Sequence, residues 1–199
     1  MVNRKKVNVQ YRRKREGRTN YYKRLKLLKS RTPRLVIRKS LKYLLLQLVE
    51  YQAAGDKVII SYNTKSLEKM GWKYSKKNLS AAYLGGLIMG KLALSKKVKE
   101  AILDAGLHTN VKGSKIYAAV KGVNDGGLVI PCGKEMYPSE DRLSGKHILT
   151  HFNKIKGQNT FQYSKLKHTS FENMPVEFNA IKEKIIKGNI PPQDKSTQK

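Results

Sequence analysis

The sequence predicts an α/β protein. We expect an antiparallel three-stranded meander plus one parallel strand covered by two helices, with a basic N-terminal arm and a helical C-terminal extension. Three observations support this: β-rich runs between residues 34 and 64, two later segments with helical apolar spacing, and arginine concentrated near the N-terminus.

The meander is predicted from three runs rich in β-branched and other apolar residues, at 34–39, 43–51 and 57–64. Pro33 precedes the first run, and Ala54-Gly55-Asp56 has turn composition between the last two. Short connections between such runs favour antiparallel neighbours, so these three strands are expected to lie side by side in chain order.

Two helices are predicted after the meander. From Lys76 onward Leu79, Tyr83, Leu87 and Leu94 fall close to one stripe, and the small residues Gly86 and Gly90 beside it indicate close packing, which we assign to the sheet. Segment 100–107 is predicted as a strand. A second helix is expected from a Ser114 cap to Gly126-Gly127, with an apolar stripe of Ile116, Val120 and Val123. This order places the last strand parallel to a neighbour, covered by both helices.

Four segments are expected along the chain. Residues 1–18 have too few aliphatic side chains to fold alone and are interpreted as an arm that orders on its partner. Residues 19–131 form the core, beginning with a short helix at 20–29 capped by Thr19, whose face carries Tyr21, Leu25 and Leu28 while Arg24 points elsewhere. Residues 132–188 form an extension, polar and turn-rich before a docking helix at 175–187, and residues 189–199 are expected to be a disordered tail.

The charge indicates a polyanionic partner. The chain has 42 lysines and arginines against 14 acidic residues, for a net charge of +28. Nine of the ten arginines lie at or before residue 38, and residues 1–39 hold 16 basic residues and one acid. Arginine's planar fork suits phosphate and base recognition. No apolar run reaches membrane-spanning length, no secretory signal is evident, and a single Cys132 forms no internal disulfide, so a cytoplasmic protein is expected.

Candidate catalytic or metal sites are weak. Asp104 and Asp125 are the carboxylates worth naming, and both are more simply read as turn residues beside glycines. His147 and His151 share helical i, i+4 spacing but lack the Glu and the third ligand of a zinc site. Cys132 has neither a zinc-type partner nor a visible base. We therefore expect no enzyme activity, no metal, no cofactor and no small-molecule substrate.

The residues also resemble a known family. Tyr11-Arg-Arg-Lys-Arg-Glu-Gly-Arg-Thr-Asn-Tyr-Tyr-Lys-Arg-Leu25 is similar to the arm signature of the L-eighteen family of large-subunit ribosomal proteins, called L-five in eukaryotes. Further similar blocks include Pro33 to Arg38, Ala101 to Leu107, and Asp125-Gly126-Gly127-Leu128 with Ile130-Pro131. Leu41 stands where the family usually has asparagine, and Cys132 where it usually has histidine. The length resembles that of the archaeal form.

The resemblance implies a structural protein of the large ribosomal subunit with an α/β core. Such a protein would bind 5S rRNA, contact large-subunit rRNA and neighbouring ribosomal proteins, and sit in the central protuberance. The rivals are a free-standing nucleic-acid-modifying enzyme and a DNA architectural protein.

The candidate RNA contacts combine the basic arm with later polar positions. They are Arg4, Lys5, Lys6, Tyr11, Arg12, Arg13, Lys14, Arg15, Arg18, Tyr22, Arg24, Arg31, Arg34, Arg38, Lys39, Lys73, Asn78 and His147. Tyr21 is expected to pack in its helix, and Trp72 is either a core anchor or a base-stacking platform.

Overall fold

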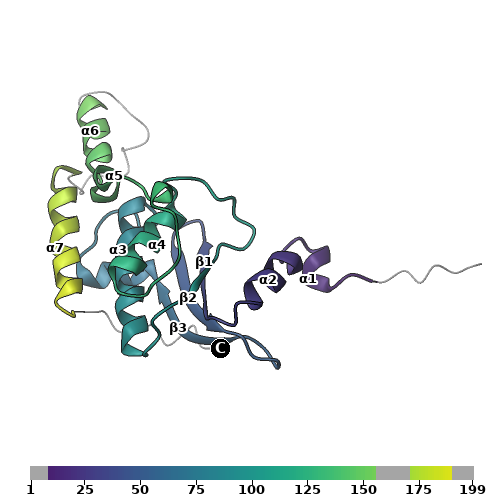
Figure 1. Ribbon diagram of the computed structural model, residues 1–199. Coiled ribbons are helices and arrows are strands. Elements are labelled where there is room, and N and C mark those ends of the chain that lie inside the picture. Colours follow the sequence, from purple (N-terminus) through teal and green to yellow (C-terminus); the bar gives the residue numbers. More distant parts are fainter. Residues whose placement is uncertain (1–8, 156–170, 190–199) are drawn as a thin grey trace, which may run out of the picture.

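A four-stranded mixed sheet forms the centre of the protein (Figure 1). The computed structural model describes residues 9–155 and 171–189. Strands β1 (Arg34–Lys39), β2 (Leu44–Glu50), β3 (Lys57–Asn63) and β4 (Ile102–Asp104) lie in the order β3-β2-β1-β4. β1 pairs antiparallel with β2, β2 pairs antiparallel with β3, and β4 runs parallel to β1. The prediction of an α/β protein with one parallel strand is confirmed.

The parallel strand is shorter than the sequence predicts. β4 covers three residues instead of the expected eight, and an isolated parallel bridge joins Glu100 to Val129 just before it. Beyond β4 the chain turns at once, because Gly106 adopts a positive φ of 59° and its N–H donates to the Asp104 carboxylate. The other three strands lie within a residue of their predicted bounds.

Strands β1 and β2 alternate between the two faces of the sheet. Leu35 and Ile37 of β1, with Leu44, Leu46 and Leu48 of β2, are at most 1% exposed and point into the core. Helix α3 (Leu79–Ser95) packs on β2 and β3, and helix α4 (Lys115–Asp125) packs along α3. Figure 1 shows both helices on the same side of the sheet, so the opposite face remains open to other elements.

The glycines of α3 pack mainly on α4, which corrects the assignment of their contact to the sheet. A Cβ on Gly86 would lie 2.1 Å from the carbonyl oxygen of Ala119, and one on Gly90 would lie 2.5 Å from that of Val123. Gly122 of α4 approaches α3 equally closely. The two helix backbones therefore touch, and only the neighbouring Gly85 faces sheet-side atoms.

Two helical segments precede the sheet: α1 (Arg12–Arg15) and α2 (Tyr21–Leu28). The cap of α2 is Asn20, whose side chain accepts from the N–H of Lys23, and not Thr19 as predicted. No residue of either helix is fully buried. Leu25 is 57% exposed while Tyr21 and Leu28 are half-buried, so α2 buries its predicted apolar face only in part, and polar contacts also hold it in place.

A 3₁₀ helix that the sequence analysis missed, η1 (Thr64–Met70), leads from β3 to Trp72. Trp72 is 1% exposed, and its indole N–H donates to the carbonyl of Ser75 at 3.2 Å. Its ring meets Tyr74 edge-on at 5.0 Å between centroids. Of the two interpretations of Trp72, the structure supports the core anchor.

The C-terminal part contains more helix than predicted. A 3₁₀ turn, η2 (Lys134–Met136), precedes α5 (Glu140–Ser144) and α6 (Lys146–Ile155), both in a segment predicted to be turn-rich. After η3 (Phe171–Asn173), helix α7 (Met174–Ile186) begins one residue before its predicted start. Its Phe178, Ile181 and Ile185 are at most 3% exposed, and α7 packs against α3. The predicted tail lies almost wholly outside the described residues.

Candidate nucleic-acid interface

A groove of about 1000 Å³ lies between the N-terminal helices and the open face of the sheet. Its walls come from α2 and the end of the arm on one side, and from β1, β2 and the segment after β4 on the other. The cationic residues that line it are Arg13, Arg18, Lys23, Arg24, Lys26, Arg34, Arg38 and Lys39, against the two carboxylates Asp56 and Asp104. Positive charge therefore predominates in the groove.

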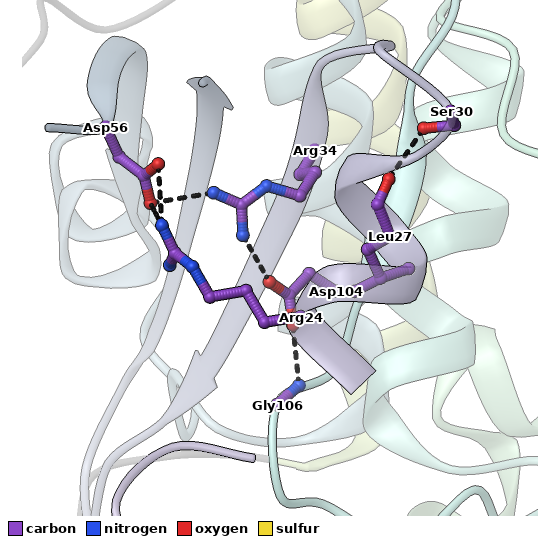
Figure 2. Close-up of polar contacts among 7 residues, drawn as sticks. All are labelled: Arg24, Leu27, Ser30, Arg34, Asp56, Asp104 and Gly106. Carbon is purple, nitrogen blue, oxygen red and sulfur yellow. Dashed lines mark hydrogen bonds and ion pairs between the residues drawn. The ribbon is translucent and has the colours of Figure 1, made fainter. Parts of the chain in front are cut away.

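The two carboxylates are engaged by arginines at the base of the groove (Figure 2). One guanidinium nitrogen of Arg34 lies 2.8 Å from Oδ2 of Asp104, and the other lies 2.7 Å from Oδ2 of Asp56. Arg24 reaches the same Asp56 from α2, and its Nη2 lies 2.9 Å from each of the two carboxylate oxygens. The network connects α2, β1, the turn before β3 and the end of β4, and so ties the start of the chain to the sheet.

The network stabilises the fold because its charged groups are largely buried. The side chain of Arg34 is 3% exposed, and those of Asp56 and Asp104 are 24% and 16% exposed. Ion pairs screened this little by water interact more strongly than surface pairs, and removing one partner leaves a poorly solvated charge. Arg34 is therefore a cross-link within the fold, and its buried guanidinium is not placed to contact RNA as predicted. Arg24 points to the sheet and not away from it.

The arm residues are open to solvent. Arg12 and Arg18 flank Glu16 at 3.1 and 3.2 Å, and Arg13 donates to the hydroxyl of Thr19 at 2.8 Å. Lys14 and Arg15 are exposed on the short helix α1. Exposed pairs of this kind contribute little stability, so these side chains can be redirected to phosphate at low cost.

Aromatic side chains accompany the arm. Tyr11, which is 72% exposed, lies 5.1 Å from Tyr21 between ring centroids. Tyr21 is half-buried, as expected for a residue that packs locally, whereas Tyr22 is 68% exposed with the Lys26 ammonium 4.5 Å from its ring centroid. Tyr11 and Tyr22 thus present rings that unpaired bases can stack on.

The remaining candidate RNA contacts do not lie together in one place. Arg38 and Lys39 are exposed and line the groove, while Arg31 is exposed at the turn before β1. Lys73 and His147 are exposed but line neither the groove nor a smaller pocket near the start of α4. Asn78 caps α3, since its side chain accepts from the N–H of Ala81 at 2.7 Å. The arm candidates Arg4, Lys5 and Lys6 lie outside the described residues.

Several groove residues escaped the sequence analysis. Gln47, Lys23, Lys26, His108 and Asn110 all line the groove. A local sequence signal could have identified Gln47. It interrupts the leucines of β2, and because strand side chains alternate between faces, it points away from the core. No local sequence signal pointed to His108. In the structure, burial and then the charge of Lys39 lower the pKa of His108, which favours the neutral ring beside the cations.

The groups considered for catalysis have structural partners. Asp125 accepts from the phenol of Tyr83 at 2.7 Å, whereas Asp104 pairs with Arg34. Burial first, and then this hydrogen bond, raise the pKa of Tyr83. Burial likewise raises the pKa of the Cys132 thiol, which makes it a poorer nucleophile. Within residues 9–155 and 171–189 no three potential metal ligands cluster, His147 and His151 included.

The open face and arm define a class of protein: an α/β domain whose exposed basic groove and stacking tyrosines fit a nucleic acid. The family comparison makes this specific. The family described as "Ribosomal large subunit proteins 60S L5, and 50S L18" matches residues 5–100 and 95–133. A curated relative, large ribosomal subunit protein uL18 of Korarchaeum cryptofilum (strain OPF8), is 45% identical over 157 residues, covering 79% of this chain and 80% of the relative. The chain belongs to this family of large-subunit ribosomal proteins.

Membership in the family agrees with the resemblance inferred from the arm and glycine blocks and assigns the chain to the large ribosomal subunit. Among the described residues, no helix combines the length and apolar character needed to cross a membrane.

Proposed function

We propose that this protein binds 5S rRNA through its arm and groove and attaches it to large-subunit rRNA in the central protuberance, beside neighbouring ribosomal proteins. The observation that carries the proposal is the groove, where Arg24 and Arg34 pair with the two lining carboxylates and six further cationic side chains line the walls. A surface of this kind attracts a polyanion.

Binding proceeds by charge neutralisation and shape recognition. Arg12, Arg13 and Arg15 donate bidentate hydrogen bonds to phosphates, while Tyr11 and Tyr22 stack on exposed bases. The network of Arg24, Asp56 and Arg34 fixes where α2 stands on the sheet, so the arm enters the RNA from a defined position. The protein works as a structural constituent, without a chemical step.

Removal of residues 1–18 tests the proposal, because the described part of this segment buries no side chain. Circular dichroism should show an intact fold, and a titration should show that most of the 5S RNA affinity disappears.

For the full chain, neutralisation of on the order of 8 phosphates predicts that the affinity for 5S RNA falls roughly 10³ to 10⁵-fold between about 50 and 200 mM salt.

The specificity control replaces Arg12, Arg13 and Arg15 together by lysine, which keeps charge and removes the planar fork. Competition between 5S RNA and unrelated RNA at one salt concentration should show a larger loss on 5S RNA. Equal affinity of the wild type for 5S RNA, unrelated RNA and DNA would contradict the proposal and favour a general nucleic-acid binder.

A further inference from the structure

The one acidic residue among the first 39 residues lies within the basic arm. Glu16 follows α1 directly, and its carboxylate lies 3.1 Å from Nε of Arg12 and 3.2 Å from Nε of Arg18. The Glu16 side chain is 34% exposed, whereas those of the two arginines are 79% and 65% exposed. By charge alone, a carboxylate at this position weakens the attraction of the arm for phosphate.

The backbone turns back on itself around this carboxylate. Gly17 adopts a positive φ of 63°, and the N–H groups of Arg18 and Thr19 both donate to the carbonyl oxygen of Arg13, at 2.9 and 3.2 Å. The side chain of Arg13 in turn donates through Nε to the hydroxyl oxygen of Thr19 at 2.8 Å. Residues 11–19 thus form a small closed unit, which we call the arm turn, although none of its side chains is fully buried.

Three arginines of the arm turn are held through the same atom. Nε makes the contact in each case: Arg12 and Arg18 meet Glu16, and Arg13 meets Thr19. In the part of the chain that the structure describes, no hydrogen bond occupies the terminal Nη nitrogens of these arginines. The edge formed by two Nη nitrogens can donate paired hydrogen bonds to a phosphate. A phosphate can therefore bind at that edge while the contact at Nε remains.

From this geometry we propose that Glu16 and Thr19 are positioning residues that make the arm selective for its RNA. They hold the guanidinium groups of Arg12, Arg13 and Arg18 in a fixed arrangement and leave the Nη edges for phosphates. The inference rests on the proposed binding of 5S rRNA and deepens it. Side chains that are ordered in advance avoid part of the free-energy cost of immobilisation on binding. Fixed spacing also favours an RNA whose phosphates match it over one that offers charge alone.

Glu16→Gln in the full chain separates charge from positioning by the sign of its effect. If Glu16 acted only through its charge, neutralisation would strengthen binding to every RNA. Positioning predicts that affinity for 5S RNA falls roughly fivefold, because two arginines must be ordered during binding, while affinity for unrelated RNA stays level or rises. Competition titrations at one salt concentration measure both affinities. Binding of 5S RNA that is as tight as the wild type, or tighter, would overturn the inference.

The matched control is Glu135→Gln, which removes the same charge from another exposed ion pair, that with Lys112, and lies outside the groove. This control should not weaken 5S RNA binding. Because exposed contacts of this kind add little to the stability of the fold, circular dichroism and thermal unfolding of both variants should match the wild type. The expected effect of Glu16→Gln is therefore on RNA selectivity and not on folding.

Thr19→Val tests the arrangement without changing charge. The substitution keeps the shape of the side chain and removes the oxygen that accepts from Arg13, so affinity for 5S RNA should fall roughly threefold. Thr150→Val on α6 is the control, because it also removes a hydroxyl hydrogen bond, to the carbonyl of Lys146, far along the chain from the arm. Wild-type affinity of Thr19→Val would overturn the role of Thr19.

Nuclear magnetic resonance of the arginine Nε–H groups in the free protein gives a measurement that needs no RNA. The groups of Arg12, Arg13 and Arg18 should be more ordered than that of Arg15, which is exposed on α1. Glu16→Gln should remove the difference for Arg12 and Arg18 and leave Arg13 ordered. Equal disorder of all four in the wild type would overturn the inference. If the wild type prefers 5S RNA and arm removal abolishes binding while Glu16→Gln changes nothing, only this inference fails.

Discussion

The two faces of the same sheet follow opposite physical rules. On the core face, Leu46 and its neighbours are fully buried against α3. On the open face, one residue away along the same strands, lie Gln47, Arg38 and the Arg34 network. In the part of the chain that the structure describes, no third layer of apolar helices covers this face; α2 stands over it and is held by ion pairs. The comparison teaches that the core face is stabilised by apolar burial, whereas the open face is stabilised by ion pairs and also presents charge.

The largest expected effect comes from Leu46→Ala on the core face. Leu46 is 0% exposed, so the change should lower the free energy of unfolding by about 4 kcal/mol, from reduced burial and a residual cavity. The neighbour Gln47→Ala should change it by less than about 0.5 kcal/mol. Chemical denaturation of the two variants measures the difference, and similar losses would show that the two faces are not distinct.

Gly86→Ala tests the helix contact above the core face. The new methyl group would lie 2.1 Å from the Ala119 carbonyl oxygen, so the helices must separate, at a cost of about 3 kcal/mol. Gly133→Ala is the control, because its φ is −64° and no atom lies within 4 Å of an added Cβ. Thermal unfolding of both variants should place only Gly86→Ala well below the wild type.

On the open face, Arg34→Met should lower stability by about 3 kcal/mol. The change leaves Asp104 without its ion pair and Asp56 with Arg24 alone, both in partly buried positions. Arg38→Met, on the same face of β1 but exposed, should leave stability nearly unchanged while weakening RNA binding. If Arg34→Met were as stable as the wild type but weaker for RNA, Arg34 would be a contact residue after all.

The smallest effect concerns Tyr74, which packs on Trp72 on the core side. Burial and then the charge of Glu177 raise the pKa of Tyr74 to about 12. A pKa raised by folding stabilises the folded state fully below the unfolded value near 10, and that contribution disappears as pH rises through about 12. Relative to Tyr74→Phe, the wild type should therefore lose stability between about pH 10 and 12. Thermal unfolding at stepped pH measures this, with the exposed Tyr51→Phe as control.

Local signals predicted some elements well. The bounds of β1 match because Pro33 and the β-rich run that follows it are local properties of the sequence. The stripe of α7 was predicted for the same reason. By contrast, α5 and α6 lie in a polar segment whose helices depend on contacts with each other and with α7, which composition does not reveal.

The candidate site divides in the same way. The density of arginines in the sequence predicted the basic arm. It also placed Arg34 among the RNA contacts, although Arg34 is buried. No sequence pattern identifies its partners, because Asp56 and Asp104 lie 22 and 70 positions away along the chain. Likewise Glu16 stands out in the sequence as the one acid among many cations, and only the turn at Gly17 places it between two arginines.

By itself, then, the sequence determined the class of fold, the family and the sign of the partner's charge, since periodicity, arginine density and ordered motifs are carried by neighbouring residues. The tertiary structure alone decided which cations face a ligand and which face a carboxylate. The physical reason is that burial and pairing are set by distances in space: Arg34 and Arg38 occupy equivalent positions of one strand, yet only Arg34 lies between two carboxylates.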